Sequence, residues 1–594
     1  MAGGTWNRLV GKERPGTYIN FATTERNIVG IGERGIVLLP LFGHNYGPAG
    51  EFITLENESP DAQYSKLGYS VYEKPLLLVK EAFKCAKKVI VYIPAQGDEA
   101  SGTVALEYEP TEISIAVSKA ADNYLGAKAD MEGCTLDYSD EYRRLSVTLT
   151  GPVSGVKNTG IFDTIGSILN DGYTITVKDT PITSAADFVA TSTFRKLNAL
   201  APGDDIFEFS AVVSKDGESE TYFVYVDYPN PMLRAASGEK PGNILTGRAL
   251  YGGTRGNDIS FDCVENEEDG YDVNIYMEND VVETFEKLHT VADLMDAGST
   301  FIKFLFSGNK EAALSAFSAI SLEGGTAGRT TTLSVTRFLD ASEAQTWTTM
   351  AFPWAPGEDG DKSLLTALVS KIKYLREDVG KYRQVVLADY TCDYEGVINV
   401  CNSYELSDGT KLTNAQATAW VAGATAGADC VTSNTYKVVE DAADVVGLLT
   451  HSETVVALKR GRFVFSFNEK QEVAVEYDIN SLTSYNDGKK AQSWRKGRVL
   501  RVLDSFGESC QVNFPPNKYD NDEDGWDIME GIGKTILKLY GPKSDGGIGA
   551  IRNVDYDNDF LVDRELSHGD EVYFNVGIQP VDSAEKLFFT VTTR

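Results

Sequence analysis

The segment from Gly549 to Arg594 constrains the fold most, because apolar and polar side chains alternate in two of its stretches. The apolar positions are Val572, Phe574, Val576 and Ile578 in the first stretch, and Leu587, Phe589 and Val591 in the second. A period of two with β-branched and aromatic side chains predicts half-buried strands. Pro580 cannot donate to a sheet ladder, so it ends the first strand or lies on an edge. The second strand lies at the chain terminus and needs a partner to stay ordered, and another subunit is one source of that partner.

Composition predicts a globular, multidomain chain that does not bind nucleic acid. A length of 594 residues favours about three or four domains. The apolar fraction of 42% is enough for hydrophobic cores. Lys and Arg total 55 against 87 Asp and Glu, so the net charge is −32. Phosphate binding needs basic surface, whereas acidity favours solubility.

The sequence also predicts a chain that stays in the cytoplasm. It does not open with a basic region and an apolar run, so we expect no secretory signal. No apolar run reaches the roughly eighteen residues that a membrane span needs. The seven cysteines are scattered, and none forms a C-x-x-C pair. This predicts free thiols in a reducing compartment, not disulfides or a zinc site.

Local patterns predict several helices. The expected ranges are Pro75–Lys88, Ser363–Arg376, Val499–Phe506 and Ile528–Leu539. In the second of these, the inward side chains should be Leu364, Leu365, Leu368, Val369, Ile372 and Leu375. Thr413 is a plausible N-cap for a further helix that carries Trp420.

Strand and loop patterns complete this prediction. Buried strands are expected at Gln384–Ala388 and Gly396–Val400. The expected hairpins join Val273–Met277 to Val281–Phe285 and Arg462–Phe467 to Val473–Ile479. The glycines between Glu323 and Gly328 predict a flexible loop.

Three stretches resemble the contractile tail sheath proteins of myovirus phages and phage-tail-like particles. They are RPGTYINF at Arg14–Phe21, GAI at Gly549–Ile551 and VGIQPVDSAEKLFFTVTT at Val576–Thr593. The resemblance is to sheaths from phages and prophage elements of Gram-positive bacteria. It implies a polymer subunit that wraps a rigid tube and shortens.

The patterns and the resemblance together predict a mixed α/β, or α+β, multidomain fold. Residues 1–25 form an N-terminal arm, and 26–98 with 247–329 form a split α/β domain. Residues 99–246 consist of short alternating runs, lack the family pattern and are expected to be an inserted, mostly β surface domain. A middle α/β domain spans 330–485, and the C-terminal α/β domain spans 486–594 and includes the terminal strand.

Two motifs suggest ligands that the sequence does not support. The run Gly531–Thr535 resembles part of a phosphate loop, but Ile528 replaces the glycine that the full motif needs. Asp520, Asp522 and Asp524 match the first half of a calcium loop, but the expected glutamate is displaced. We favour an acidic turn that caps the next helix, and a weak surface calcium site is the alternative.

No catalytic motif is evident. The four histidines are far apart, and the sequence contains neither a G-x-S-x-G nor an H-E-x-x-H motif. We therefore predict no catalytic residue, no metal and no cofactor. Two alternatives stay open: another β-rich virion assembly or receptor-binding protein, or an enzyme whose site is assembled in space.

The resemblance assigns contacts between subunits to both ends of the chain. In the family, an N-terminal arm and a C-terminal arm from two subunits complete the sheet of a third. The matching residues here are Thr17, Tyr18, Ile19, Asn20 and Phe21, and Leu587, Phe588, Phe589, Thr590 and Val591.

The resemblance also implies the remaining partners. In the family, a helix near the C-terminus of the chain holds the tube. The matching residues here are Lys534 and Lys538, which lie four residues apart on one face of the predicted helix. The expected partners are further copies of this chain, the tail tube protein, and the baseplate and tail terminator proteins. The resemblance places the chain in a virion tail that is assembled in the bacterial cytoplasm and that ejects a genome by contracting.

Overall fold

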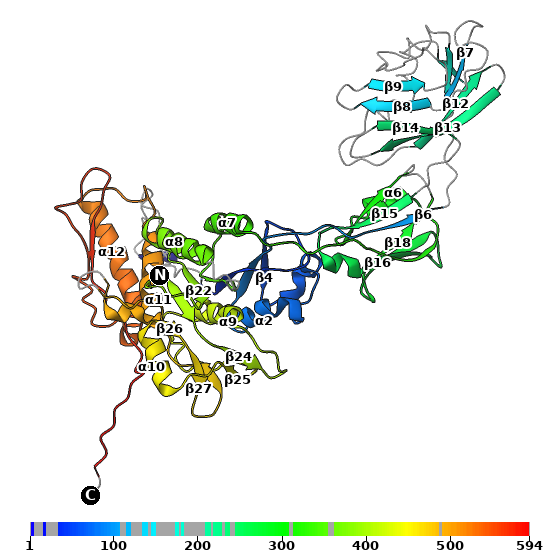
Figure 1. Cartoon of the computed structure of the whole chain (residues 1–594). Coiled ribbons are helices and arrows are strands. Elements are labelled where there is room, and N and C mark those ends of the chain that lie inside the picture. Colours follow the sequence, from blue (N-terminus) through cyan, green and yellow to red (C-terminus); the bar gives the residue numbers. More distant parts are fainter. Residues whose placement is uncertain are drawn as a thin grey trace. The chain divides into compact units, whose positions relative to one another are not determined.

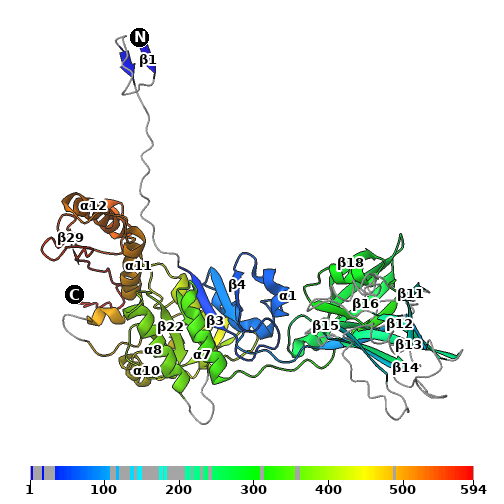
Figure 2. The ribbon, with the colours of Figure 1, turned by 90° about the horizontal axis from the view of Figure 1, so that it is seen from above.

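The computed structural model describes residues 34–106, 244–307, 313–354, 362–485 and 490–592, and elsewhere the backbone of β1, β2 and β7 to β14. The chain forms two compact units, and many of their elements are labelled in Figures 1 and 2. Unit 1 contains Met1–Leu39, Leu78–Ile90 and Leu339–Arg594. Unit 2 contains Pro40–Leu77 and Val91–Phe338.

A parallel sheet forms the centre of unit 1. Its strand order is β26-β23-β22-β21-β3-β5. These strands are β3 (Ile36–Pro40), β5 (Lys88–Tyr92), β21 (Thr349–Ala351), β22 (Gln384–Ala388), β23 (Val397–Val400) and β26 (Arg462–Phe463). Every residue of β3, β21, β22 and β23 is buried, as expected for parallel strands covered on both faces. The structure thus confirms the predicted buried strands.

Two helices cover this sheet and were predicted from local signals. All six inward positions predicted for α8 (Ser363–Glu377) are buried. Thr413 caps α9 (Asn414–Gly427) in a capping box with Gln416, which satisfies amides at the helix start. A Cβ atom added to Gly423 would lie 2.3 Å from the carbonyl oxygen of Ala82, so only glycine lets α9 approach α2 (Leu77–Phe83) this closely. Figure 1 shows α8 and α9 flanking the sheet.

The C-terminal part of unit 1 consists of two helices and a small hairpin. These elements are α11 (Gly497–Asn513), α12 (Glu523–Tyr540), β29 (Phe560–Val562) and β30 (Phe574–Val576). The Tyr540 hydroxyl lies 2.7 Å from Ser505 Oγ and 2.8 Å from Ser509 Oγ, which joins α12 to α11. Gly533 faces Phe560, and an added Cβ atom would lie only 2.0 Å from that ring. Both predicted helices are confirmed and are longer than expected.

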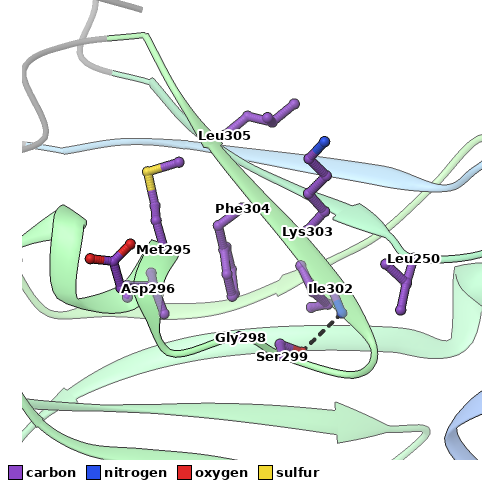
Figure 3. Close-up of a pocket in the computed structure, with 10 residues that line it drawn as sticks. Leu250, Met295, Asp296, Gly298, Ser299, Ile302, Lys303, Phe304 and Leu305 are labelled. Carbon is purple, nitrogen blue, oxygen red and sulfur yellow. Dashed lines mark hydrogen bonds between the residues drawn. The ribbon is translucent and has the colours of Figure 1, made fainter. Parts of the chain in front are cut away.

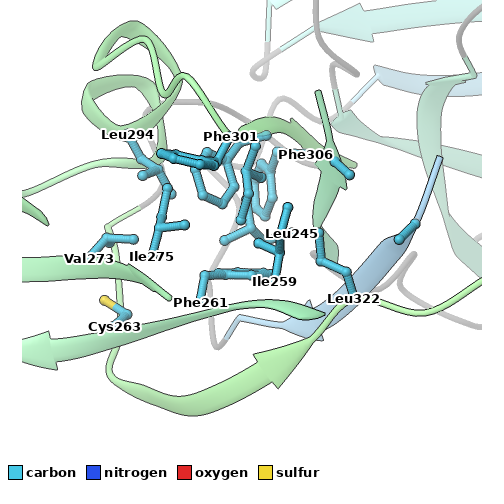
Figure 4. Close-up of a cluster of buried hydrophobic side chains, with 14 of the residues drawn as sticks. Leu245, Ile259, Phe261, Cys263, Val273, Ile275, Leu294, Phe301, Phe306 and Leu322 are labelled. Atoms are coloured by element: carbon cyan, nitrogen blue, oxygen red, sulfur yellow. The ribbon is translucent and has the colours of Figure 1, made fainter. Parts of the chain in front are cut away.

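Unit 2 contains a β-rich body around an aromatic core. One sheet has the order β19-β15-β6 and the other β18-β17-β16-β20. Phe261 meets Phe304 and Phe317 edge to face, with ring centroids 5.3 Å and 5.6 Å apart. The surrounding cluster is drawn in Figure 4. The predicted hairpin at residues 273–285 is confirmed, and Glu278 has the positive φ of 58° that its two-residue turn requires.

The bounds of the remaining described elements complete the fold. The helices are α1 (Tyr64–Leu67), α6 (Val291–Asp296), α7 (Thr332–Ala341) and α10 (His451–Lys459). Strands of unit 1 are β1 (Ala2–Gly4), β2 (Gly16–Tyr18), β24 (Ser403–Leu406), β25 (Ala442–Val446), β27 (Phe465–Phe467) and β28 (Val473–Val475). Strands of unit 2 are β4 (Phe52–Glu56), β6 (Ser101–Ala105), β15 (Ile244–Ala249), β16 (Ile259–Glu265), β17 (Tyr271–Met277), β18 (Asp280–Leu288), β19 (Ile302–Phe306) and β20 (Phe317–Ser321).

A separate set of strands lies between β6 and β15 in the sequence. Six of them form a sheet of order β11-β10-β7-β12-β13-β14, and β8 pairs with β9. Their bounds are β7 (Ile115–Lys119), β8 (Cys134–Ser139), β9 (Arg144–Leu149), β10 (Tyr173–Val177), β11 (Thr180–Ile182), β12 (Glu208–Lys215), β13 (Glu218–Asp227) and β14 (Met232–Ser237). β6 and β15 pair antiparallel with Ala105 opposite Ile244, so this segment leaves and re-enters the parent sheet at adjacent residues.

The structure divides the chain differently from the predicted domains in one respect. We expected residues 26–98 to join 247–329, but β3 and most of α2 and β5 fall in unit 1. The reason is that β3 pairs in parallel with β21, a partner about 300 residues away that no local pattern reveals.

Two local predictions are also corrected. The helix expected at Pro75–Lys88 ends at Phe83, and Lys88 already begins β5. The strand expected at Arg462–Phe467 is interrupted at Val464, so β26 joins the parallel sheet while β27 pairs with β28. The hairpin itself, formed by β27 and β28, is confirmed.

The loop at Glu323–Gly328, predicted to be flexible, is instead held by specific contacts. Asp98 N donates to Thr326 Oγ1 over 2.9 Å, and Thr326 Oγ1 donates to Asp98 Oδ2 over 2.8 Å. Asn257 forms two hydrogen bonds with the backbone of Gly325. A Cβ atom added to Gly97 would lie 1.7 Å from the Thr326 carbonyl oxygen. Glycine at this position therefore allows the two backbone segments to approach closely.

Two glycines of α12 provide a matched test of packing against β29. Gly533→Ala should destabilise the chain by roughly 1–3 kcal/mol, because the new methyl group overlaps the Phe560 ring. Gly531→Ala is the control, since its Cβ position is open and helix propensity predicts a gain of about 0.5–1 kcal/mol. Urea unfolding of both variants measures the difference, and equal stabilities would contradict the packing described here.

Candidate functional site

Helix α11 binds the central part of unit 1 through buried ion pairs. The Arg376 guanidinium contacts both carboxylate oxygens of Asp504, at 2.6 Å and 3.0 Å. Arg501, which is fully buried, lies 2.7 Å from Asp478 and also donates to the Thr432 carbonyl. These contacts fix α11 on α8 and on the loops after β28 and α9.

A cluster of polar contacts holds the chain at residues 582–585, and we call it the C-terminal clamp. Lys496 Nζ lies 2.8 Å from Asp582 Oδ2 and 2.7 Å from Glu585 Oε2. The other Glu585 oxygen accepts hydrogen bonds from Ser433 and Thr435, both over 2.9 Å. Burial lowers the pKa of Lys496, but its hydrogen bonds with both carboxylates outweigh burial and raise that pKa, which keeps Lys496 charged.

Beyond the clamp, the chain carries apolar side chains that are mostly exposed. The exposed fractions are 67% for Leu587, 91% for Phe588, 83% for Phe589 and 85% for Val591. Residues 582–592 form no strand in this chain. The alternating pattern therefore has no partner among the described residues, and the intersubunit strand stays a prediction. We call Leu587–Val591, which includes Thr590, the apolar segment.

The first alternating stretch is a strand over only part of its expected length. β30 covers Phe574–Val576 and pairs antiparallel with β29, with Val576 opposite Phe560. β30 already ends at Val576, so Pro580, four residues later, does not itself end the strand and forms an isolated bridge with Ile551.

The predicted N-terminal arm is described only in part. Thr17 and Tyr18 belong to β2, which pairs in parallel with β1, Thr17 opposite Gly3 and Tyr18 opposite Gly4. Ile19, Asn20 and Phe21 lie outside the described residues. The pairing shows that part of the arm forms a strand, while its partner in another subunit stays a prediction.

The two lysines predicted to face a tube differ in their surroundings. Lys534 Nζ lies 3.4 Å from Asp557 Oδ1 of the same chain, and its side chain is 36% exposed. Lys538 is exposed, and its ammonium group lies 5.9 Å from the centre of the Tyr556 ring. The exposed stripe of α12 consists of Asp524, Asp527, Ile528, Gly531, Thr535 and Lys538. This stripe changes from acidic near the start of the helix to basic near its end. Lys538 is therefore a better candidate than Lys534 for a contact with the tube.

The calcium-like motif is a helix cap. Asp522 is the N-cap of α12, and its side chain accepts a hydrogen bond from Gly525 N over 2.8 Å. Asp524 lies in the first turn, where a negative charge favours the helix dipole, and Asp520 precedes the cap. The predicted capping role is thus confirmed. Among the described residues, no group of three His, Cys, Asp or Glu side chains is placed to hold a metal ion.

The other ligand-like features do not form a reaction centre either. Gly531–Thr535 lies inside α12, in agreement with the helix-interior prediction. His44 is buried, donates toward the Leu67 carbonyl and has its pKa lowered to about 4 by burial, which makes it neutral near pH 7. A shallow pocket of about 300 Å³ beside α6 and β19, drawn in Figure 3, is lined mainly by apolar and small residues such as Met295, Phe304 and Leu305. No described helix is long and apolar enough to cross a membrane.

Sequence comparison identifies the C-terminal half of the chain. Residues 328–481 match the phage tail sheath protein central domain, and residues 489–594 match the phage tail sheath C-terminal domain. Residues 328–481 and 489–594 thus carry the central and C-terminal domains of phage tail sheath proteins. The apolar segment lies within the part that matches the C-terminal domain of this family, whereas the clamp joins both matched parts, with Ser433 and Thr435 in the central domain and Lys496, Asp582 and Glu585 in the C-terminal domain.

Full-length relatives support this assignment. The phage-like element PBSX protein XkdK of Bacillus subtilis is 27% identical over 610 residues, which cover 100% of this chain and 99% of the relative. The sheath tail protein of Desulfitobacterium hafniense has a TM-score of 0.63 at 27% identity, covering 97% of this chain and 99% of the other. The sheath tail protein of Listeria innocua has a TM-score of 0.59 at 25% identity and covers 95% of each chain.

The sequence carries no local signal for the residues that position these surfaces. Lys496 and Glu585 are 89 residues apart, and Arg376 and Asp504 are 128 apart. Single charges at such separations carry no local signal. Only the spacing of Arg501 and Asp504, three residues apart in the helix predicted at Val499–Phe506, indicated that charged residues share one helix face there.

Removal of one charged partner should lower the free energy of unfolding more for these buried ion pairs than for a surface pair. Arg501→Met leaves Asp478 buried without its cation and should cost about 3–5 kcal/mol. Arg564→Met removes an exposed pair with Asp527 and should cost less than about 1 kcal/mol. Chemical denaturation of both variants measures the costs. A small effect of Arg501→Met would show that α11 is held by apolar packing alone.

Proposed function

We propose that this sheath protein is the repeating subunit of a helical polymer that surrounds a tail tube and contracts. The observation that carries the proposal is the apolar segment. It follows the clamp in the chain, and its four large apolar side chains are exposed. A helical polymer needs heterologous interfaces that do not close into a ring. Strand addition by the apolar segment to a neighbouring sheet supplies such an interface through main-chain hydrogen bonds.

The same lattice explains how contraction proceeds without chemistry. The extended polymer is a kinetically trapped state, and release by the baseplate lets the subunits move to a more stable arrangement while the arms stay paired. The role is structural rather than catalytic and uses no cofactor. The partners are further copies of this chain, the tail tube, the baseplate and the tail terminator, with assembly in the bacterial cytoplasm before the tube is driven through an envelope.

The inserted strands decorate the outside of this polymer. Their entry and exit are adjacent at Ala105 and Ile244, so the parent sheet closes without them. This arrangement suits a surface domain that a scaffold tolerates. It also suits a receptor-binding module, the second candidate function, and electron microscopy separates the two because a sheath gives striated tubes and a receptor-binding protein gives discrete trimers.

Removal of Leu587–Arg594 tests the role of the apolar segment. The truncated chain should keep its melting temperature, because the apolar side chains of Leu587–Val591 are mostly exposed in their own subunit, but it should stay monomeric. Analytical ultracentrifugation and electron microscopy measure assembly. Tubes of normal length from the truncated chain would refute the role of the apolar segment as an intersubunit arm. Global unfolding would instead show that the segment belongs to the core of its own subunit.

Charge reversal on α12 tests the tube contact. Lys538→Glu should impair assembly on tubes, more strongly at low salt, because repulsion from an acidic tube surface is less screened there. Lys534→Glu is the matched control and should have a smaller effect, since Lys534 already faces Asp557. Co-sedimentation with tubes at two ionic strengths provides the measurement, and equal binding by the Lys538 variant and the unmodified chain would exclude this contact.

A further inference from the structure

We infer that Glu585 is a positioning residue that fixes where the intersubunit arm leaves its own subunit. The inference rests on the proposed function of the apolar segment and adds the residue that sets the segment's origin and reach. The basis is a contrast between two nearby residues. Glu585 is held by three side chains, whereas the side chain of Leu587, two residues later, is mostly exposed.

The contacts of Glu585 are unusual for a residue so close to an unpaired segment. Its carboxylate is only 9% exposed and accepts from Ser433 and Thr435 on one oxygen and Lys496 on the other. Charged hydrogen bonds of this kind are short and stronger than neutral ones. The partners come from two parts of unit 1, the loop after α9 and the start of α11, so the clamp ties the chain to the body of the subunit.

Neighbouring contacts are weaker and do not replace Glu585. Asp582 shares Lys496, but its side chain is 41% exposed. Ser583 accepts from Arg498 over 3.0 Å, and the Lys586 ammonium group lies 5.9 Å from the centre of the Tyr477 ring. Glu585 is therefore the last residue before the apolar segment with a well-buried anchoring side chain.

The clamp sets the length of chain available to a neighbour. With Glu585 held, the free chain begins at Lys586, and the eight residues that follow it reach about 26 Å when extended. The last backbone hydrogen bond between described residues before this point is Val581 N to the Ala550 carbonyl. Release of Glu585 would add at least two residues, or roughly 7 Å, to the free chain, and about four residues, or roughly 13 Å, if the weaker contacts of Asp582 and Ser583 were lost as well. A shorter free chain reaches less far, which restricts the arm to one neighbouring sheet at a defined distance.

Trypsin provides a direct readout, because Lys586 is a cleavage site at the boundary. Glu585→Ala should raise the rate of cleavage after Lys586, followed as release of the peptide Leu587–Arg594, by about tenfold or more, as expected when charged hydrogen bonds are lost. Asp582→Ala is the matched control, and it should raise the rate less. Glu585→Gln, which keeps the hydroxyl contacts, should be intermediate and gives a second variant if Glu585→Ala does not fold.

Assembly of the same variants completes the test. Glu585→Ala should give fewer or irregular tubes although the apolar segment is intact. Unchanged cleavage would overturn the clamp, and faster cleavage with normal tubes would overturn its positioning role. Failure of the proposed function looks different: the chain that lacks Leu587–Arg594 would then form tubes as well as the full chain does.

Discussion

The C-terminal part of this protein depends on charge that is buried along one face of α11. Arg501 and Asp504 point inward and meet Asp478 and Arg376, all with side chains almost out of contact with solvent. Burying such ions costs several kcal/mol each, and only an intact pair with good geometry compensates for that cost. Separating α11 from the sheet would leave unpaired charges in an apolar medium. The two regions that match the sheath family therefore behave as one mechanical body within unit 1.

A rigid body makes an exposed apolar segment useful. In the proposed polymer, the intersubunit strand would pass a pulling force to its neighbour only if its point of attachment did not yield. The clamp at Glu585 joins that point to the start of α11 and thus to the buried charges. The same segment is a liability in the free subunit, because exposed apolar strands promote aggregation. A net charge of −32 opposes unspecific association before assembly.

The sequence predicted features that arise from contacts within about one helical turn or one hairpin. The six inward positions of α8, the Thr413 cap and the turn at Glu278 all follow from neighbouring residues. It failed where distant contacts decide. The break at Val464, the pinned loop at Thr326 and the partner of β3 depend on segments far away in the sequence. For the candidate surfaces, the sequence identified the apolar segment and α12, but neither the clamp nor the pairing of Lys534 with Asp557.

The pairing of β6 with β15 also sets an order of events during synthesis. When Ala105 leaves the ribosome, its ladder partner Ile244 still lies roughly 140 residues away, a separation whose closure carries an entropic cost. The intervening strands are made complete in that interval, and domains generally fold as they emerge. The insert is thus complete before its host sheet can close, and once formed it brings the ends of β6 and β15 together, so that the inserted segment also acts as an internal guide for the sheet that carries it.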